Sequence, residues 1–259
     1  MKPIRILTWL LILVGTASFA AAQNPFVGAW KLNQEKSHLA GDRLTFLPAE
    51  GQAIELRAGG TKYSFRVDGN TYRMATGDLA AWKQPSPDTW TTVYSKPDGK
   101  TLETDTWKLS SDGKTLTVVT TGTKPAGEKF TDTAVYTRTA GASGLIGSWQ
   151  STEVKLSSPD QLVIEANGLS GLSIKIAALK ASLVADFDGK DVAPVGPNVP
   201  PGLTIALIRI GPSSFRMVQK INGSVVYSSR YVVSADSQTM TETGNSPGDP
   251  SNTSLWERQ

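Results

Sequence analysis

Few residues in this 259-residue chain have the types and spacing that catalysis requires. His38 is the only histidine and there is no cysteine, so a zinc site or a Ser-His-Asp triad would depend on this one residue. It follows Glu35-Lys36-Ser37 in a polar stretch, where a histidine is usually a solvated loop residue. No Gly-x-Ser-x-Gly motif accompanies it. We therefore expect no catalytic residue, no metal and no cofactor.

Two pairs of carboxylates have a spacing that could serve acid–base chemistry. Glu103 and Asp105 alternate with Trp107 along a run typical of a β-strand, which would put both carboxylates on one face. We expect that face to be the solvated outside of the sheet. Asp186 and Asp188 are also two positions apart, but the second directly precedes a glycine and is more simply part of a turn. No closing Glu stands at the spacing of a calcium loop.

Aromatic residues on predicted strands support binding better than catalysis. Trp90, Thr92 and Tyr94 share one strand face, and Trp107 could join them from the partner strand. Such a face can line a small-molecule pocket, and it can equally fill a dry core. Trp82 lies in a polar, proline-containing stretch, Thr76 to Asp88, which we interpret as a long loop at a barrel mouth. The candidate ligand-binding residues of both halves are Trp82, Trp90, Tyr94, Trp107, Phe215, Tyr227 and Tyr231.

The elements that must position these residues are predicted to be strands. Threonine, valine and aromatic residues form short runs separated by Asp-Gly and Asn-Gly turns. The clearest meander runs from Thr89 to Thr120, with turns at Asp98-Gly99 and Asp112-Gly113. Ala166 to Leu183 fits strands or a short helix, and its two glycines argue against a long helix. A second long loop is expected at Pro194 to Gly202. The chain is therefore expected to be all-β.

The second half of the chain repeats landmarks of the first half in the same order. Gly28-Ala29-Trp30 corresponds to Gly147-Ser148-Trp149, 119 residues later. Val135 to Arg138 corresponds to Leu255 to Arg258, 120 residues later. Offsets that drift by a few residues between landmarks are expected of duplicated β-domains. The predicted division is a first domain at 24–139, a small-residue linker at 140–144 and a second domain at 145–259.

The N-terminus is typical of an export signal. Lys2 and Arg5 precede an apolar run of nine residues, Ile6 to Val14, and the small residues Ala20 to Ala22 offer a cleavage site. The apolar run is shorter than the about 20 residues of a spanning helix. We expect cleavage after residue 22, no transmembrane anchor afterwards, and a location in the periplasm or outside a bacterium. An uncleaved anchor is the alternative.

The remaining composition limits the class of partner. Removing residues 1–22 takes away two of the 26 basic residues, which leaves 24 against 23 acidic ones. No run of Lys and Arg alternates with aromatics, so we expect no nucleic acid partner. An exported chain without cysteine cannot use disulfides, so each domain must be held by its own buried core.

The Gly-x-Trp near the start of each half, with an arginine near each end, resembles the calycin superfamily of lipocalins and their relatives. The string GAWKLNQEKSHL, with DGKTLTVV and VYTRT, is similar to secreted bacterial lipocalin-like proteins of unknown function. The resemblance implies two tandem antiparallel lipocalin-like β-barrels. It also implies that an arginine covers a tryptophan ring at the closed end, Arg138 over Trp30 and Arg258 over Trp149. The residues expected to close the barrels are Gly28, Trp30, Arg138, Gly147, Trp149 and Arg258.

The strand count per half is not fixed by the pattern, so a partly open barrel or a sandwich is the alternative architecture. We expect an exported, non-enzymatic protein that binds a small apolar or amphipathic ligand in a barrel cavity. The competing hypothesis is a structural or protein-interaction module with filled barrels and no small-molecule ligand. An enzyme is the third, and the sequence does not predict a protein partner.

Overall fold

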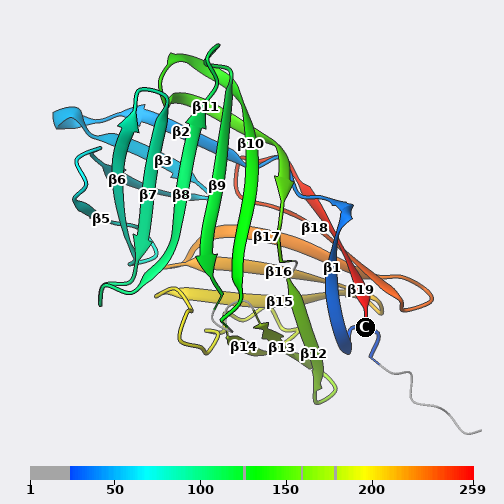
Figure 1. Cartoon of the computed structure of the whole chain (residues 1–259). Coiled ribbons are helices and arrows are strands. Elements are labelled where there is room, and N and C mark those ends of the chain that lie inside the picture. Colours follow the sequence, from blue (N-terminus) through cyan, green and yellow to red (C-terminus); the bar gives the residue numbers. More distant parts are fainter. Residues whose placement is uncertain (1–23, 125–126, 159, 178–179) are drawn as a thin grey trace, which may run out of the picture.

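The computed structural model describes residues 24–124, 127–158, 160–177 and 180–259. This part of the chain forms two antiparallel β-sheets, each curled into a nearly closed barrel (Figure 1). The predicted all-β class and the two barrels are thus confirmed. The predicted export signal lies outside the described residues. Among those described, no helix is long and apolar enough to cross a membrane.

Barrel I is the ten-stranded sheet, and barrel II is the nine-stranded sheet. The strand order in barrel I is β4 (Thr61–Phe65), β3 (Ile54–Ala58), β2 (Arg43–Pro48), β11 (Ile146–Lys155), β10 (Lys129–Ser143), β9 (Thr115–Thr123), β8 (Thr101–Leu109), β7 (Thr89–Ser95), β6 (Leu79–Ser86) and β5 (Thr71–Arg73). The order in barrel II is β14 (Ala181–Asp186), β13 (Gly171–Ile176), β12 (Gln161–Asn167), β1 (Gly28–His38), β19 (Asn252–Arg258), β18 (Thr239–Asn245), β17 (Ser224–Val233), β16 (Ser214–Ile221) and β15 (Leu203–Gly211). A 3-10 turn, Glu50–Gln52, connects β2 to β3.

The two halves of the chain exchange their first strands. β1 pairs with β12 and β19 of barrel II, and β11 pairs with β2 and β10 of barrel I. Apart from the extra strand β5, the two orders match position by position once β1 and β11 trade places. This match agrees with the predicted duplication. The sheets nevertheless do not follow the predicted division at 140–144.

The reason for the exchange lies in the stretch predicted to be a linker. β10 continues to Ser143, and a turn at Gly144 leads directly into β11. Ser143 pairs with Ile146 across this turn, so β11 must return alongside β10. The place beside β19 in barrel II is then taken by β1. The predicted linker is therefore a β-hairpin with bulges.

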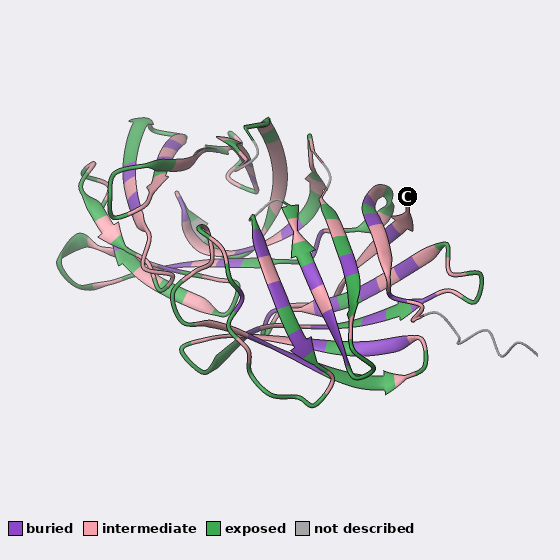
Figure 2. Cartoon of the chain, turned by 90° about the horizontal axis from the view of Figure 1, so that it is seen from below, coloured by how far each residue is buried: buried purple, intermediate pink, exposed green. Residues whose placement is uncertain are grey.

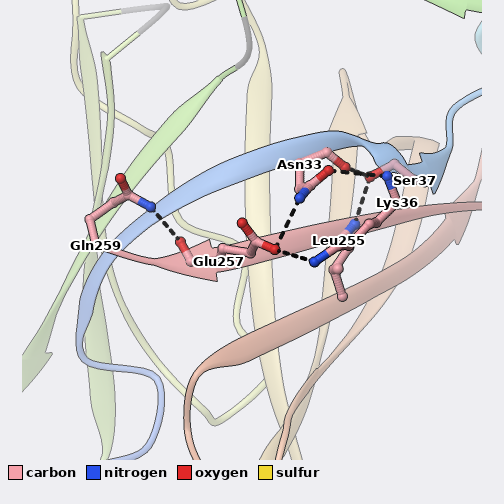
Figure 3. Close-up of polar contacts among 6 residues, drawn as sticks. All are labelled: Asn33, Lys36, Ser37, Leu255, Glu257 and Gln259. Atoms are coloured by element: carbon pink, nitrogen blue, oxygen red, sulfur yellow. Dashed lines mark hydrogen bonds and ion pairs between the residues drawn. The ribbon is translucent and has the colours of Figure 1, made fainter.

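Side chains of β1 hold it against β19 (Figure 3). The Asn33 side-chain amide donates a hydrogen bond to Glu257 at 3.0 Å, and the Lys36 ammonium forms an ion pair with the same carboxylate at 2.9 Å. The Ser37 hydroxyl accepts a hydrogen bond from the Leu255 backbone N–H at 2.9 Å, where the register between the two strands shifts. The register between β1 and barrel II is thus set by specific contacts as well as by backbone pairing.

Residues that follow the exchanged strands β1 and β11 form hydrogen bonds with the other exchanged strand. The Gly41 N–H donates to the Ser151 hydroxyl at 2.8 Å, and the Leu156 N–H donates to the Gln34 side chain at 2.9 Å. The Leu32 N–H likewise donates to the Asp160 carbonyl at 3.0 Å. The two barrels are therefore joined where their chains cross.

Each barrel is closed by a tryptophan under an arginine, but the predicted pairing of the four residues is wrong. The Arg258 guanidinium lies 4.2 Å from the ring centre of Trp30, and that of Arg138 lies 4.0 Å from the ring centre of Trp149. Both tryptophans are fully buried. The crosswise pairing follows from the strand exchange, because each tryptophan is carried on the strand that changes barrel.

The glycine of each Gly-x-Trp makes room for this closure. A Cβ atom at Gly28 would collide with the Arg258 guanidinium, and one at Gly147 would collide with the Ala140 carbonyl oxygen. Both residues also have positive φ, 151° at Gly28 and 140° at Gly147. The motif thus has a structural cause in both halves.

Buried and exposed residues alternate along the strands (Figure 2), and the buried ones form one hydrophobic core in each barrel. The Asp-Gly turns lie where they were predicted, with positive φ at Gly69, Gly99, Gly113 and Gly189. Asp188 accepts a hydrogen bond from the backbone of Lys190 and belongs to such a turn, as expected. Within the ambiguous stretch 166–183, the described residues contain the end of β12, all of β13 and the start of β14.

Candidate ligand-binding cavity in barrel I

Barrel I encloses a cavity of about 310 Å³ that is partly open to solvent. Its walls come from β2, β3, β4, β7, β8 and the segment between β5 and β6. Most of the lining is apolar or aromatic, with a few polar groups. The lining residues are Leu44, Leu56, Ala58, Thr61, Tyr63, Met74, Ala75, Thr76, Asp78, Tyr94, Leu102, Glu103 and Trp107.

Barrel II leaves much less room. Its interior cavity measures about 140 Å³ and is lined almost entirely by apolar side chains. Phe26, Phe215 and Tyr231 fill the interior, with Phe215 stacked on Tyr231 at a centroid distance of 4.7 Å. The two barrels thus share a topology, but only barrel I encloses space for more than a very small molecule.

Trp82 is a core residue of barrel I, which corrects the prediction of an exposed loop residue. The stretch around it forms β6, and the side chain is fully buried. Its ring stacks on Phe65 at 4.3 Å, and its indole N–H donates a hydrogen bond to the Tyr63 hydroxyl at 2.9 Å. Pro85 lies where β6 and β7 lose their register, between Lys83 and Ser86, so a strand tolerates it.

The other predicted binding residues are divided between the two barrels. Tyr94 and Trp107 line the cavity of barrel I, whereas Trp90 is buried but does not line it. Phe215 and Tyr231 line the small cavity of barrel II. Tyr227 does not line that cavity, and its hydroxyl donates a hydrogen bond to Asn252 at 3.0 Å. Trp107 is fixed by a hydrogen bond from its indole N–H to the Thr92 hydroxyl at 3.0 Å.

Glu103 and Asp105 face the interior of barrel I, contrary to the prediction that their face is solvated. Both share a face of β8 with buried Trp107, while Thr106 and Lys108 on the other face are exposed. A signal for this was present in the sequence, since alternation puts both carboxylates on the same face as a tryptophan. The inward carboxylates are the feature of the site that sequence reasoning missed.

The two carboxyl groups differ in their partners. Asp105 accepts a hydrogen bond from the Thr120 hydroxyl at 2.7 Å and also interacts with the Tyr94 hydroxyl. Burial raises the pKa of Asp105 to about 6 in spite of these bonds. The Glu103 carboxyl group has neither a hydrogen bond nor an ion pair with any residue that the structure describes. Burial, followed by the neighbouring Asp105 and Asp132 carboxyl groups, raises the pKa of Glu103 to about 7.

Barrel II shows how the same fold satisfies a buried carboxyl group. Glu242 accepts a hydrogen bond from the Tyr231 hydroxyl at 2.7 Å and one from the Trp256 indole N–H at 3.3 Å. At the register position where barrel I pairs Tyr94 with Glu103, barrel II pairs Gln219 with Tyr227. An interior carboxyl group without a partner is therefore specific to barrel I.

His38 is exposed at the end of β1 and takes no part in the cavity. The cavity thus combines an apolar pocket, an aromatic wall and one carboxyl group that the described protein does not engage. Comparison with protein-family models, with curated proteins and with solved structures found no match to this chain.

Proposed function

We propose that this chain is an exported, non-enzymatic protein that binds a small amphipathic ligand in barrel I. The observation that carries the proposal is the cavity of about 310 Å³ with mainly apolar walls. Small-molecule sites are typically concave, about 300 to 1,000 Å³ in volume and lined by hydrophobic and aromatic side chains with a few polar groups. Tyr63, Tyr94 and Trp107 supply the aromatic wall.

Binding without catalysis fits the surroundings of the cavity. Asp105, the second carboxyl group on β8, is occupied by Thr120 and Tyr94 and does not line the cavity. A general acid–base pair would need both groups within reach of a bound substrate. The resemblance to lipocalin-like proteins supports the barrel fold in this proposal, and with the predicted export signal it supports the exported location.

The experiment is a titration with N-phenyl-1-naphthylamine, a neutral apolar dye whose fluorescence rises in apolar surroundings. Ala58 lines the cavity at the end of β3, so Ala58→Trp should fill part of it. Exposed Ala140 on β10 does not line the cavity, and Ala140→Trp is the matched control. We expect saturable binding of one dye per chain, lost in Ala58→Trp and kept in Ala140→Trp. Equal binding by both variants would refute the proposed site.

A second candidate function is an interaction module, and the filled interior of barrel II favours it for that barrel. Its cavity of about 140 Å³ lies below the usual volume of a ligand site. Barrel II would then support barrel I and present an outer surface. Met217→Trp changes only the interior of barrel II, and dye binding that is unchanged in this variant would agree with this division of roles.

A further inference from the structure

The chemical class of the ligand can be inferred from the polar group that the cavity leaves without a partner. This step rests on the proposed function, since it concerns what the same cavity would bind. Glu103 lines the cavity opposite Tyr94 on the neighbouring strand. The Glu103 side chain is half-buried. A carboxylate that loses part of its contact with water is costly unless it is paired or hydrogen-bonded, and no described residue pairs with this one.

The charged groups around Glu103 do not supply the missing partner. On the same strand Asp105 is acidic, and Asp132 on β10 is acidic as well. Asp78 lines the cavity, and Lys96 directly follows β7. The two form an ion pair with each other at 2.9 Å. Lys100 and Lys124 line an adjoining hollow that also includes Glu103, but neither forms an ion pair with it. Lys124 instead reaches Asp160 at 3.5 Å and donates to the Ser158 carbonyl at 2.6 Å.

The opposite wall of the cavity is apolar. Leu44, Leu56 and Met74 lie on the side formed by β2, β3 and the segment after β5, and Trp107 adds an aromatic face. A ligand that fits this arrangement needs an apolar body and one hydrogen-bond-donating cationic group. We propose that barrel I binds an amphipathic amine, with the ammonium group paired to Glu103 and the apolar body against the leucines, Met74 and Trp107.

The contrast with barrel II supports this inference. Its interior carboxyl group, Glu242, is fully occupied by Tyr231 and Trp256 and serves the core. If Glu103 also served the core, an equivalent donor would be expected near it. The position of Glu103 in barrel I corresponds to that of Tyr227 in barrel II. Tyr227 is neutral, and its hydroxyl donates a hydrogen bond to Asn252.

The test compares three probes with the same chain and different head groups: octylamine, octanol and octanoate. Each competes with N-phenyl-1-naphthylamine at pH 8. Charge-assisted hydrogen bonds are about twice as strong as neutral ones, so octylamine should displace the dye at about tenfold lower concentration than octanol. Octanoate should be the weakest, because it faces Glu103, Asp105 and Asp132.

Glu103→Gln should remove this preference and bring octylamine close to octanol. Glu50 is exposed in the turn between β2 and β3 and lies outside the cavity, so Glu50→Gln is the control and should keep the preference. From pH 8 to pH 5, the affinity for octylamine should fall by about tenfold in the wild type, close to the affinity for octanol, as Glu103 is protonated, while the affinity for octanol should not change.

The outcomes separate this inference from the proposed function. If octanol or octanoate displaces the dye at the same concentration as octylamine, the amine inference is overturned and a binding cavity remains. A preference for octylamine that survives in Glu103→Gln would overturn it in the same way. Failure of all three probes and of the dye to bind would overturn the proposed function itself.

Discussion

Replacing Glu103 with glutamine should stabilise the folded chain at high pH and have little effect at low pH. The carboxyl group is inside barrel I, has no partner among the described residues, and has its pKa raised by burial to about 7 from 4.5. Raising a carboxyl pKa on folding means that the folded state holds its proton more tightly than the unfolded state. The free energy of unfolding therefore falls as pH rises from 4.5 to about 7 and stays low above that range.

The magnitude follows from the interval between the two pKa values. One pH unit corresponds to about 1.4 kcal/mol, so ionising folded Glu103 costs about 3 kcal/mol once the pH is well above 7. At pH 5 the folded group is protonated and the cost is below about 1 kcal/mol. Glutamine is never ionised, so it should remove the difference. We expect Glu103→Gln to gain about 2 to 3 kcal/mol relative to the wild type between pH 5 and pH 8.5.

The assay is urea unfolding followed by tryptophan fluorescence, at pH 5.0 and pH 8.5, for the wild type, Glu103→Gln and the exposed control Glu50→Gln. The control should follow the wild type at both values. A Glu103→Gln variant that is equally or less stable than the wild type at pH 8.5 would refute the reasoning. It would mean that ionised Glu103 has a stabilising partner in the folded chain.

Three further predictions test other parts of the account. A double-mutant cycle between Arg138 and Trp149 should give a coupling energy of about 0.5 to 2 kcal/mol in urea unfolding, whereas Arg138 with Trp30 should give none; coupling to Trp30 would contradict the strand exchange. A chain cut at Gly144 should yield two fragments, 24–143 and 145–259, that co-purify when expressed together, because each carries a strand of the other barrel; two fragments that each fold alone as monomers would argue against the exchange. Trp82→Ala should lower the free energy of unfolding by about 3 to 5 kcal/mol, since the side chain is fully buried in the core; a loss below about 0.5 kcal/mol would instead fit the exposed contact residue predicted from the sequence.

The repeated landmarks predicted the duplication because they arise from local chemistry. Asp-Gly turns, alternating strands and the Gly-x-Trp motif depend on residues close to each other in the chain. The exchange of β1 and β11 depends instead on pairing between strands far apart in the chain, and the resemblance of the two halves hides which strand pairs with which barrel. The tight turn at Gly144, where the sequence AGASG suggested a small-residue linker, returns β11 alongside β10 and leaves the place beside β19 to β1.

The candidate site was only partly predictable for a similar reason. Tyr94 and Trp107 were expected at a cavity because strand alternation gives their common face. Trp82 was misplaced because its stretch contains two prolines and several polar residues, a pattern that fits a loop and also fits a strand with a bulge. The inward direction of Glu103 and Asp105 was missed because buried carboxylates are rare, and the usual expectation for charged residues favours the solvated face.

Binding of a small molecule inside barrel I is tested most directly by native mass spectrometry of the chain purified from its own host. The account predicts one small molecule per chain in the wild type and in Ala140→Trp, and none in Ala58→Trp. A bound molecule that persists in Ala58→Trp, or a wild-type chain that carries none and binds neither the dye nor octylamine, would contradict it.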